Sequence, residues 1–397
     1  MEIHTEDLIQ DTGTGRLLLG PGPSMVHPRV YQALARPLYG HLDPEFLSLM
    51  DEVQERLRRA FKTDNPFTVS ISGTGSAGME AALINLIEPG DEVLVCVNGV
   101  FGARMADIVE RCGGVLHRID RPWGEVFDPQ EVATALNRYP RTRVVSIVHA
   151  ETSTGAHQPL AEIGSLCREQ DRLFVVDAVT SLGGMDLAVD NWNIDACYSG
   201  TQKCLSCPPG LAPLTLGPRA RERLRTRTRK VQSWYLDLAM IESYWAERSR
   251  TYHHTAPISM SYGLHEALAI VLEEGLEARF ERHRLHSRAL LAGLQTLGCE
   301  PSVHEDHRLP MLNAVLIPTG IDDAAVRTEL RSRYNIEIGG GLGELAGKIW
   351  RIGLMGESAR EESVMSLLGA LEEILSAMGR STPPEAAQRA AAEVYGR

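Results

Sequence analysis

The segment FVVDAVTSLGGMDLAVDNWNIDACYSGTQK spans residues 174–203. It holds two short apolar runs, 173–176 and 196–199, each typical of a buried strand. Asp177 ends the first run, and Lys203 follows the second after the polar loop 200–202. Parallel strands bring their carboxyl ends to one edge of a sheet. We therefore expect the carboxylate and the lysine to face the same flat ligand.

A lysine beside a carboxylate suits pyridoxal phosphate chemistry. The lysine forms a Schiff base with the cofactor, and the acid keeps the pyridinium nitrogen protonated. The protonated ring draws electrons from the α-carbon of a bound amino acid, so Asp177 has to stay ionised close to the ring. Lys203, once released, can move the proton between the α-carbon and the cofactor. Alone, such an Asp is more often a helix cap or loop residue. The pair with its neighbours favours catalysis.

Composition limits the class of protein. The chain has 397 residues, 43% of them hydrophobic and 23% charged, which suits a soluble globular protein of two or three domains. Its net charge of -12 argues against nucleic acid or an anionic membrane as partner, because the long-range field has the wrong sign. The polar start, residues 1–15, lacks an apolar signal core, and no apolar run reaches membrane-spanning length. We expect a cytoplasmic protein.

The chain carries no pattern typical of a metal site. Its seven cysteines include a C-x-x-C at Cys204 and Cys207, but no second pair has zinc-ligand spacing, so both are expected to be packing residues in a reducing compartment. His253 and His254 are adjacent and would point to different sides of an extended chain. We expect no metal.

The order of patterns along the chain predicts an α/β fold. Residues 1–16 are interpreted as an arm, and 17–28, rich in Gly and Pro, as a fixed loop without regular structure. One helix is expected over 44–61. From Thr68 onward apolar strands alternate with helical stretches near 101–113, 128–138 and 159–170. Such repetition predicts a mostly parallel central sheet with helices on both faces.

Several turns at the expected strand ends carry polar or aromatic groups. Small residues at 72–76 precede an Ala-rich helix, whose first N–H groups would bind the cofactor phosphate. No Walker A lysine follows them. Phe101 offers a face for ring stacking, although a Phe that opens a helix is also a common core residue. Glu151, Thr152 and Ser153 would hydrogen-bond the ring hydroxyl, line the substrate side or cap the following turn.

The last third of the chain predicts a small α+β domain. The basic stretch 219–238 is interpreted as a solvated helix that leads to a subunit interface. A long helical stretch at 261–298 precedes strand-like runs and helices at 322–333 and 360–378, and the tail forms a loosely docked helix without assigned function. Arg351, in the run IWRIG, could pair with a substrate carboxylate or form a structural ion pair.

Ordered motifs between Leu17 and Met378 carry a family resemblance. They are GPGPS (20–24), SGTGSAGMEAAL (72–83), NGVFGAR (98–104), HAETSTG (149–155), VDAVTSLGG (176–184), YSGTQKCL (198–205), YHHTAPIS (252–259), GGLGELAGK (340–348) and WRIGLMG (350–356). By these the chain resembles the class V aminotransferases, pyridoxal phosphate enzymes of fold type I. The resemblance implies an arm and loop at 1–23, a large cofactor domain at 24–272 and a small domain at 273–397.

The resemblance also implies residue roles. Lys203 would be the Schiff-base lysine and Asp177 the pyridinium partner. Phe101 stands where some relatives have tryptophan, which keeps the flat face but loses an indole N–H. The implied cofactor-binding residues are Thr74, Gly75, Ser76, Phe101, Thr152, Asp177, Val179, Gln202, Lys203 and, from the other subunit of a homodimer, Tyr252 and Thr255. The implied substrate-binding residues are Gly22, Thr152 and Arg351.

The expected reaction moves an amino group from L-alanine to glyoxylate and gives pyruvate and glycine. Serine and (S)-ureidoglycine are alternative donors that need only a different donor pocket. Relatives that use ureidoglycine carry a glutamine and an asparagine where this chain has His41 and Tyr252, which favours alanine here. From another class, a dinucleotide-binding oxidoreductase would share the strand–helix pattern, but it gives Lys203 beside Asp177 no role.

Overall fold

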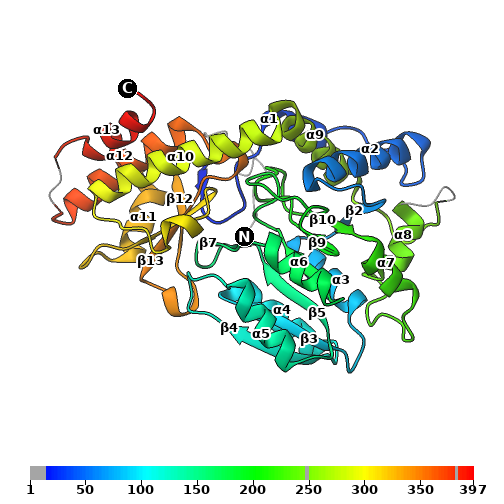
Figure 1. Ribbon diagram of the computed structural model, residues 1–397. Coiled ribbons are helices and arrows are strands. Elements are labelled where there is room, and N and C mark those ends of the chain that lie inside the picture. Colours follow the sequence, from blue (N-terminus) through cyan, green and yellow to red (C-terminus); the bar gives the residue numbers. More distant parts are fainter. Residues whose placement is uncertain (1–14, 246–249, 381–382) are drawn as a thin grey trace, which may run out of the picture.

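The computed structural model describes residues 15–245, 250–380 and 383–397 in two lobes, each built around a sheet (Figure 1). The large lobe holds a seven-stranded sheet in the order β2-β10-β9-β8-β5-β3-β4. Only β10 runs antiparallel to its neighbours. Its strands are β2 (Phe67–Ser72), β3 (Glu92–Val97), β4 (Val115–Asp120), β5 (Thr142–Val148), β8 (Leu173–Asp177), β9 (Ala196–Tyr198) and β10 (Leu211–Leu216). The predicted mostly parallel α/β sheet is confirmed.

Helices of the large lobe pack on this sheet around a core that spans Val30 to Val271. They are α1 (Pro28–Leu34), α2 (Pro44–Phe61), α3 (Gly75–Leu86), α4 (Val100–Arg111), α5 (Pro129–Arg138), α6 (Ala161–Glu169), α7 (Pro218–Arg225), α8 (Leu238–Trp245) and α9 (Ile258–Glu274). A short hairpin joins β6 (Ala150–Glu151) to β7 (Ala156–His157). The helix predicted over 44–61 is confirmed with these limits, and the structure shows that Asp43 caps its first turn and Pro44 opens it.

The small lobe is built on a four-stranded sheet in the order β1-β12-β13-β11. Its strands are β1 (Leu17–Leu19), β11 (Leu312–Leu316), β12 (Ile336–Gly340) and β13 (Ile349–Gly353). The lobe's helices are α10 (Leu276–Thr296), α11 (Asp323–Arg333), α12 (Glu361–Ala377) and α13 (Ala386–Val394). Leu19 packs in the same core as Trp350. The domain limits at residues 23 and 272 stay a prediction.

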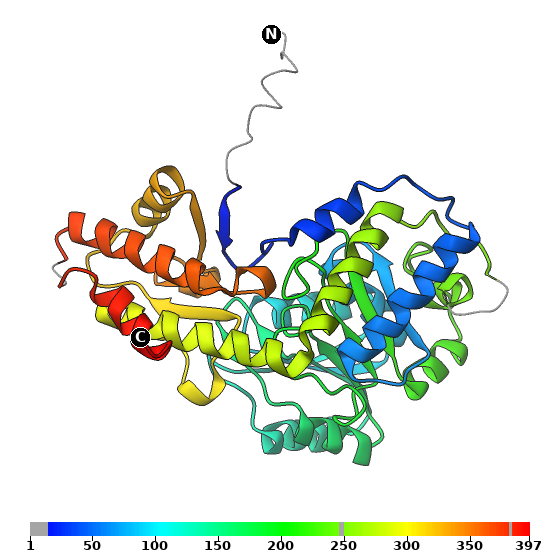
Figure 2. The ribbon, with the colours of Figure 1, turned by 90° about the horizontal axis from the view of Figure 1, so that it is seen from above.

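The prediction that 17–28 lacks regular structure was wrong at its start. Leu17–Leu19 form β1, which pairs in parallel with β12. The Gly and Pro residues that exclude a strand begin only at Gly20, so the three leucines before them are free to pair. Figure 2 shows β1 beside the small lobe, from which the chain crosses to α1 on the large lobe.

Two helix predictions also needed correction. The stretch 261–298 is not one helix, because Gly275, with φ 85°, separates α9 from α10. In the basic stretch 219–238, helix α7 ends at Arg225 and most of the remainder is irregular.

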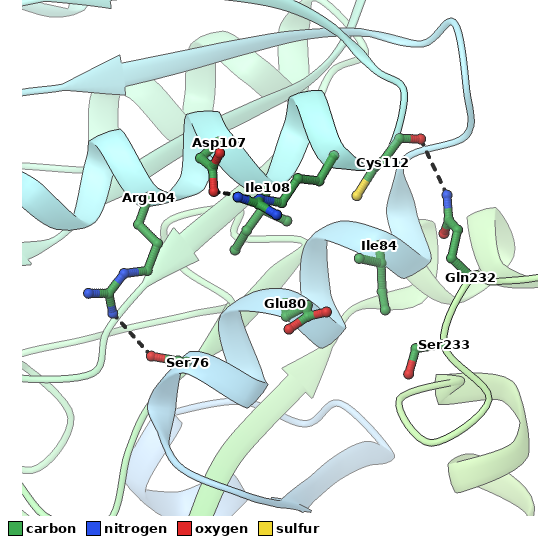
Figure 3. A pocket seen from close by; sticks show the side chains of 10 residues that line it. Ser76, Glu80, Ile84, Arg104, Asp107, Ile108, Cys112, Gln232 and Ser233 are labelled. Carbon is green, nitrogen blue, oxygen red and sulfur yellow. Dashed lines mark hydrogen bonds and ion pairs between the residues drawn. The ribbon is translucent and has the colours of Figure 1, made fainter.

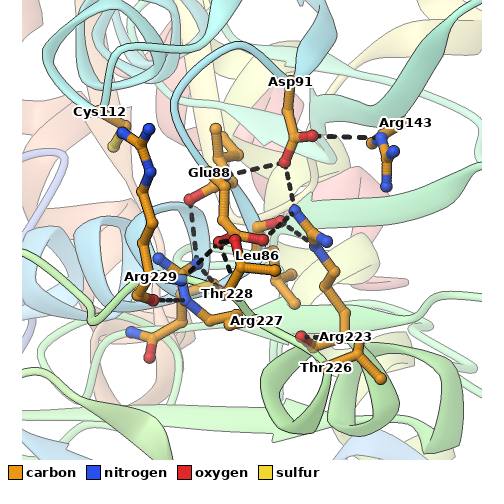
Figure 4. A network of polar contacts seen from close by, with 12 residues as sticks. Leu86, Glu88, Asp91, Cys112, Arg143, Arg223, Thr226, Arg227, Thr228 and Arg229 are labelled. Atoms are coloured by element: carbon orange, nitrogen blue, oxygen red, sulfur yellow. Dashed lines mark hydrogen bonds and ion pairs between the residues drawn. The ribbon is translucent and has the colours of Figure 1, made fainter.

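A polar network also fixes the irregular part, most of whose side chains are exposed as expected (Figure 4). Arg227 Nη1 donates to the carbonyl oxygens of Ile84, Asn85 and Ile87 at 3.2, 2.7 and 3.0 Å. These carbonyls lie at the C-terminal end of α3, where a helix offers no N–H groups of its own to bind them. Glu88 Oε1 accepts from the backbone N–H and hydroxyl of Thr228, each at 2.9 Å. The basic residues therefore fix the C-terminal end of α3.

No helix in the described ranges is both long enough and apolar enough to cross a membrane. Within the same ranges, no group of three or more His, Cys, Asp or Glu residues could hold a metal ion.

Candidate active site

One cavity of about 280 Å³ lies where β8, β9 and the start of α3 meet. It brings together all the cofactor residues expected from a single chain. The residues that line it are Thr74, Gly75, Ser76, Met79, Phe101, Arg104, Ala150, Thr152, Asp177, Val179, Thr180, Gln202 and Lys203. The adjacent strands β8 and β9 explain why Asp177 and Lys203 converge, since both strands end at this edge.

Lys203 lies in the turn after β9, with its amine toward the cavity. Its Nζ donates to the carbonyl oxygen of Pro21. Burial, with a smaller contribution from the nearby Arg351 guanidinium, lowers the pKa of Lys203 to about 8. The amine therefore carries a neutral fraction at physiological pH, which a nucleophile requires.

Asp177 ends β8 and is buried. Its Oδ1 accepts from the Val179 backbone N–H at 2.8 Å, and its Oδ2 accepts from the Tyr198 hydroxyl at 3.0 Å. Burial raises the pKa of Asp177 to about 7, although both hydrogen bonds act to lower the pKa. A cation placed in the cavity beside this carboxyl would favour its ionised form.

The N-terminus of α3 forms another wall of the cavity. Thr74 is the N-cap without a side-chain capping bond, so the first N–H groups of α3 point outward from the helix end. A Cβ at Gly75 would lie 2.9 Å from Val179 Cγ2, so only glycine lets the backbone approach here. Gln202 Oε1 is buried and has no hydrogen-bond partner in the described part of the chain.

Glu151 and Ser153 do not reach the cavity as expected. Glu151 Oε2 accepts from the backbone N–H groups of Phe101 and Gly102 at 3.1 and 3.2 Å. Ser153 Oγ accepts from the Val100 N–H at 2.9 Å. Both side chains thus hold the N-terminus of α4, where unpaired N–H groups attract a carboxylate. They fix Phe101 on the cavity wall and do not line it.

Thr152 and Arg351 connect the two lobes. Thr152 lines the cavity, and its carbonyl oxygen accepts from Arg351 Nη1 at 3.2 Å. Arg351 Nε donates to the Gly340 carbonyl at 2.7 Å. Arg351 has no carboxylate partner among the described residues, so the structural ion pair considered from the sequence does not form. Burial lowers the pKa of Arg351 from its usual value.

Gly22 lies against the lysine side chain. A Cβ at Gly22 would stand 2.7 Å from both Cδ and Nζ of Lys203, and the backbone φ of 109° also requires glycine. Ser24, two residues on, donates its hydroxyl to the Lys203 carbonyl at 2.7 Å. The loop 20–24 therefore packs against the lysine.

Tyr252 and Thr255 lie away from this cavity in the same chain. Tyr252 is 53% exposed, and its ring packs on His41 with centroids 4.9 Å apart. The hydroxyls of Tyr252 and Thr255 are 3.5 Å apart. Neither residue lines the cavity of its own chain, and their place in a partner's site stays a prediction.

Arg104 lines the cavity and was missed from the sequence. It lies one helical turn after Phe101, with its guanidinium carbon 5.1 Å from the centroid of that ring. Its Nη1 donates to Ser76 Oγ at 3.1 Å. The spacing from Phe101 was the available signal, because residues three apart share a helix face. Met79, Ala150 and Thr180, small or apolar wall residues, gave no such signal.

These groups suit pyridoxal phosphate. A flat ring fits against Phe101, and a phosphate fits the open N–H groups of α3. Lys203 and Asp177 supply the amine and the acid that its carbonyl and ring nitrogen need.

Comparison with known proteins identifies the family. The model of the family described as "Aminotransferase class-V" matches residues 21–350. A crystal structure of alanine–glyoxylate aminotransferase from Nostoc sp. is 48% identical, covering 94% of this chain and 100% of its own, with a TM-score of 0.90. That of ureidoglycine–glyoxylate aminotransferase from Bacillus subtilis is 43% identical, covering 98% and 100%, with a TM-score of 0.95.

A curated sequence relative agrees with these structures. The alanine–glyoxylate aminotransferase of Drosophila melanogaster is 41% identical over 364 residues, covering 91% of this chain and 92% of its own. The family match leaves no place for the rival interpretation as a dinucleotide-binding oxidoreductase. With its fold and its lysine–aspartate cavity, this chain belongs to the class V aminotransferases.

Proposed function

We propose that this protein is a pyridoxal phosphate-dependent homodimer that transfers the amino group of L-alanine to glyoxylate and forms pyruvate and glycine. The observation that carries the proposal is the convergence of Lys203 and Asp177 on one cavity beside an open helix N-terminus. Thr74, Gly75, Ser76 and Gln202 would hold the phosphate, and Phe101 and Val179 would enclose the ring. When bound, the cofactor supplies an electron sink for the carbanion at the substrate's α-carbon.

Lys203 has two tasks in this proposal. It holds the cofactor covalently in the resting enzyme, and after release it carries the proton to and from the substrate's α-carbon. Burial that lowers the pKa of Lys203 to about 8 keeps part of the amine neutral and basic near pH 7 to 8. The Pro21 carbonyl and Gly22 limit the space in which the amine can move.

Asp177 would hold the proton on the ring nitrogen. The Val179 N–H and the Tyr198 hydroxyl fix the orientation of its carboxyl group. Burial raises the pKa of Asp177, so a neighbouring cation is needed to keep the carboxyl ionised. The protonated ring nitrogen of a bound cofactor would be that cation, and the ionised Asp177 would in turn favour its proton.

Arg351 would bind the carboxylate that alanine and glyoxylate share. Its guanidinium is buried and held by the carbonyls of Thr152 and Gly340. A buried cation without an anionic partner is costly, and a substrate carboxylate would relieve that cost. Thr152 and Gly22 would form the walls beside the bound substrate.

Overall likeness does not select the donor, because relatives named for alanine and for ureidoglycine are similarly close. We infer alanine from His41 and Tyr252, which would face the partner's cavity. Their imidazole and phenol cannot satisfy all donors and acceptors of a ureido group, and each buried unpaired polar group costs about 1 to 3 kcal/mol. The methyl group of alanine needs no hydrogen bond.

With glyoxylate held constant, we expect kcat/KM for alanine to exceed that for ureidoglycine by about 10²-fold or more. Serine, with one hydroxyl, should be the nearest competitor. Initial rates of 2-oxo acid formation from the three donors measure this. A ureidoglycine value above that of alanine would show that these side chains do not set the donor pocket. No transamination with any amino donor would refute the proposed function itself.

The surface around Tyr252 suits a subunit interface. Exposed aromatic and large apolar side chains occur on α1, on the loop that follows it and in the segment 234–240, parts of which contact residues 252–254. His41 packs on Tyr252, Trp234 packs on His253, and Tyr235 packs on His254. The exposed side chains of these segments are those of Tyr31, Leu38, Tyr39, Leu42, Trp234, Tyr235 and Met240. Exposed apolar residues gathered in this way favour association with a second copy.

We infer that Tyr252 and Thr255 complete the phosphate site of the partner. A Lys203→Ala chain and a Tyr252→Phe/Thr255→Ala chain should each have low activity alone. After subunit exchange, one of the two sites of a mixed dimer combines both intact halves. Mixed dimers make up about half of a 1:1 mixture, so the activity averaged over all dimers should rise toward about a quarter of the wild-type value. Assays of the mixture after exchange verified by mass spectrometry test this. Unchanged activity in verified mixed dimers would mean that each site is built from one chain.

We place the reaction in the cytoplasm, where it would supply glycine from glyoxylate. All seven cysteines are free and buried, which suits a reducing compartment.

A further inference from the structure

Arg104 is a cation of the cavity wall that, like Arg351, has no acidic partner among the described residues. Its guanidinium contacts the hydroxyl of Ser76 and the face of Phe101, both on the cavity wall. Arg111 lies seven residues after Arg104, on the same face of α4, and it pairs with Asp107 at 2.7 Å. In the part of the chain that the structure describes, no carboxylate lies within ion-pair distance of Arg104.

Figure 3 shows how Arg104 extends from α4 toward Ser76 in the first turn of α3. The residue lies at the border between the site cavity and a neighbouring cavity of about 560 Å³, and it lines both. The guanidinium thus lies beside the N-terminus of α3, which carries a partial positive charge. Two positive groups placed together without a counter-ion favour the binding of an anion between them.

The phosphate ligands proposed above leave a charge unbalanced. Thr74, Gly75, Ser76 and Gln202 are uncharged, as are Tyr252 and Thr255 from the partner. A helix N-terminus contributes only about half an elementary charge, whereas a phosphate monoester carries nearly two negative charges near pH 7. The amine of Lys203 would be consumed in its bond to the cofactor. Arg104 is the remaining cation on the cavity wall in the described structure.

From this geometry we propose that Arg104 is a cofactor-binding residue that pairs with the phosphate group of the bound cofactor. The inference rests on the proposed function. Ser76 and Phe101 hold the guanidinium in place before the cofactor arrives, so its planar fork is oriented toward the phosphate site. Arg104 supplies the charge, while the N–H groups of α3 and the hydroxyls supply the remaining hydrogen bonds.

The test compares pyridoxal phosphate with pyridoxal, which lacks the phosphate. Both form the same bond with Lys203 and present the same ring to Phe101, so their ratio of dissociation constants isolates the phosphate contacts. Cofactor-free protein is titrated with each compound and followed by visible absorbance. We expect Arg104→Gln to weaken pyridoxal phosphate binding about 10- to 100-fold and pyridoxal binding less than about 2-fold. Arg104→Lys should fall between, since it keeps the charge but loses the fork.

Arg111→Gln is the matched control. It is the same substitution on the same helix face, but its guanidinium pairs with Asp107 and does not line the site cavity. It should leave the ratio unchanged. Equal weakening of both compounds by Arg104→Gln would assign Arg104 a structural role and overturn the inference, and so would unchanged binding of both. Wild-type protein that binds neither compound would instead overturn the proposed function, and this inference with it.

Discussion

Replacing Lys203 with alanine should lower the rate of transamination by about 10³-fold or more. The substitution removes both the covalent attachment of the cofactor and the base that moves the α-proton. Because burial lowers the pKa of Lys203 to about 8, the charged amine is disfavoured in the folded chain relative to the unfolded chain. That penalty is present below pH 8 and fades as the pH rises toward the ordinary lysine value. Removal of the amine should therefore not unfold the protein at pH 7.

The scarcity of lysine makes the attachment site easy to establish. The chain has only four lysines, at 62, 203, 230 and 348. Lys62 is paired with Asp186 and Glu277, and Lys230 and Lys348 are exposed. After borohydride reduction, peptide mapping should find the pyridoxyl group on Lys203. Lys230→Ala, the matched control, should keep full activity. A label on another lysine, or an active Lys203→Ala protein, would disprove the assignment.

Asp177→Asn should slow removal of the α-proton by about 10²- to 10³-fold, a rise of about 3 to 4 kcal/mol in the barrier. The amide keeps the size of the side chain and can still accept from the Val179 N–H. It no longer offers a charge to hold the proton on the ring nitrogen. Retention of the cofactor should change less than about 10-fold, because Lys203 and the phosphate contacts remain. Single-turnover absorbance changes with alanine measure the step directly.

Asp195→Asn provides the comparison for Asp177→Asn. Asp195 is also buried, but it precedes β9 and pairs with Arg219, so it lies at the opposite end of the strand from Lys203. The change should lower stability while the folded protein keeps its single-turnover rate. If Asp177→Asn retained the wild-type rate, another group would have to hold the ring nitrogen. If both variants slowed the step equally, loss of packing would explain the effect.

The parts of the fold that local patterns determine could be predicted from the sequence. Apolar runs followed by Asp177 or by the loop before Lys203 placed two neighbouring strand ends correctly, since both signals lie within 30 residues. The limits of α2 followed in the same way from the helical spacing of the apolar residues within 44–61. The motifs at 72–83, 176–184 and 198–205 then predicted Gly75, Val179 and Gln202 as site residues, and all three line the cavity.

What failed depended on contacts between distant segments. Nothing near Leu17 reveals that Ile336 will pair with it, and nothing near Arg227 reveals the carbonyls of α3. Glu151 was expected near the ligand because it follows a strand, but its carboxylate accepts hydrogen bonds from the first N–H groups of α4 instead. Arg104 was missed because its significance depends on Ser76, which belongs to another helix. A single sequence without its fold does not show these pairings.

Strand β1 has a consequence for how the protein is made. Leu17 leaves the ribosome early but pairs with Ile336, roughly 300 residues later in the chain. The loop that begins one residue after β1 supplies Pro21 and Gly22 to the lysine. Closing a segment of this length is entropically costly and slow. The large lobe can fold during synthesis, but the wall beside Lys203 is anchored only after β12 has emerged. A nascent or truncated chain that ends before β12 would thus have a folded cofactor lobe and an unfinished lysine pocket, so competence for catalysis should appear late in translation.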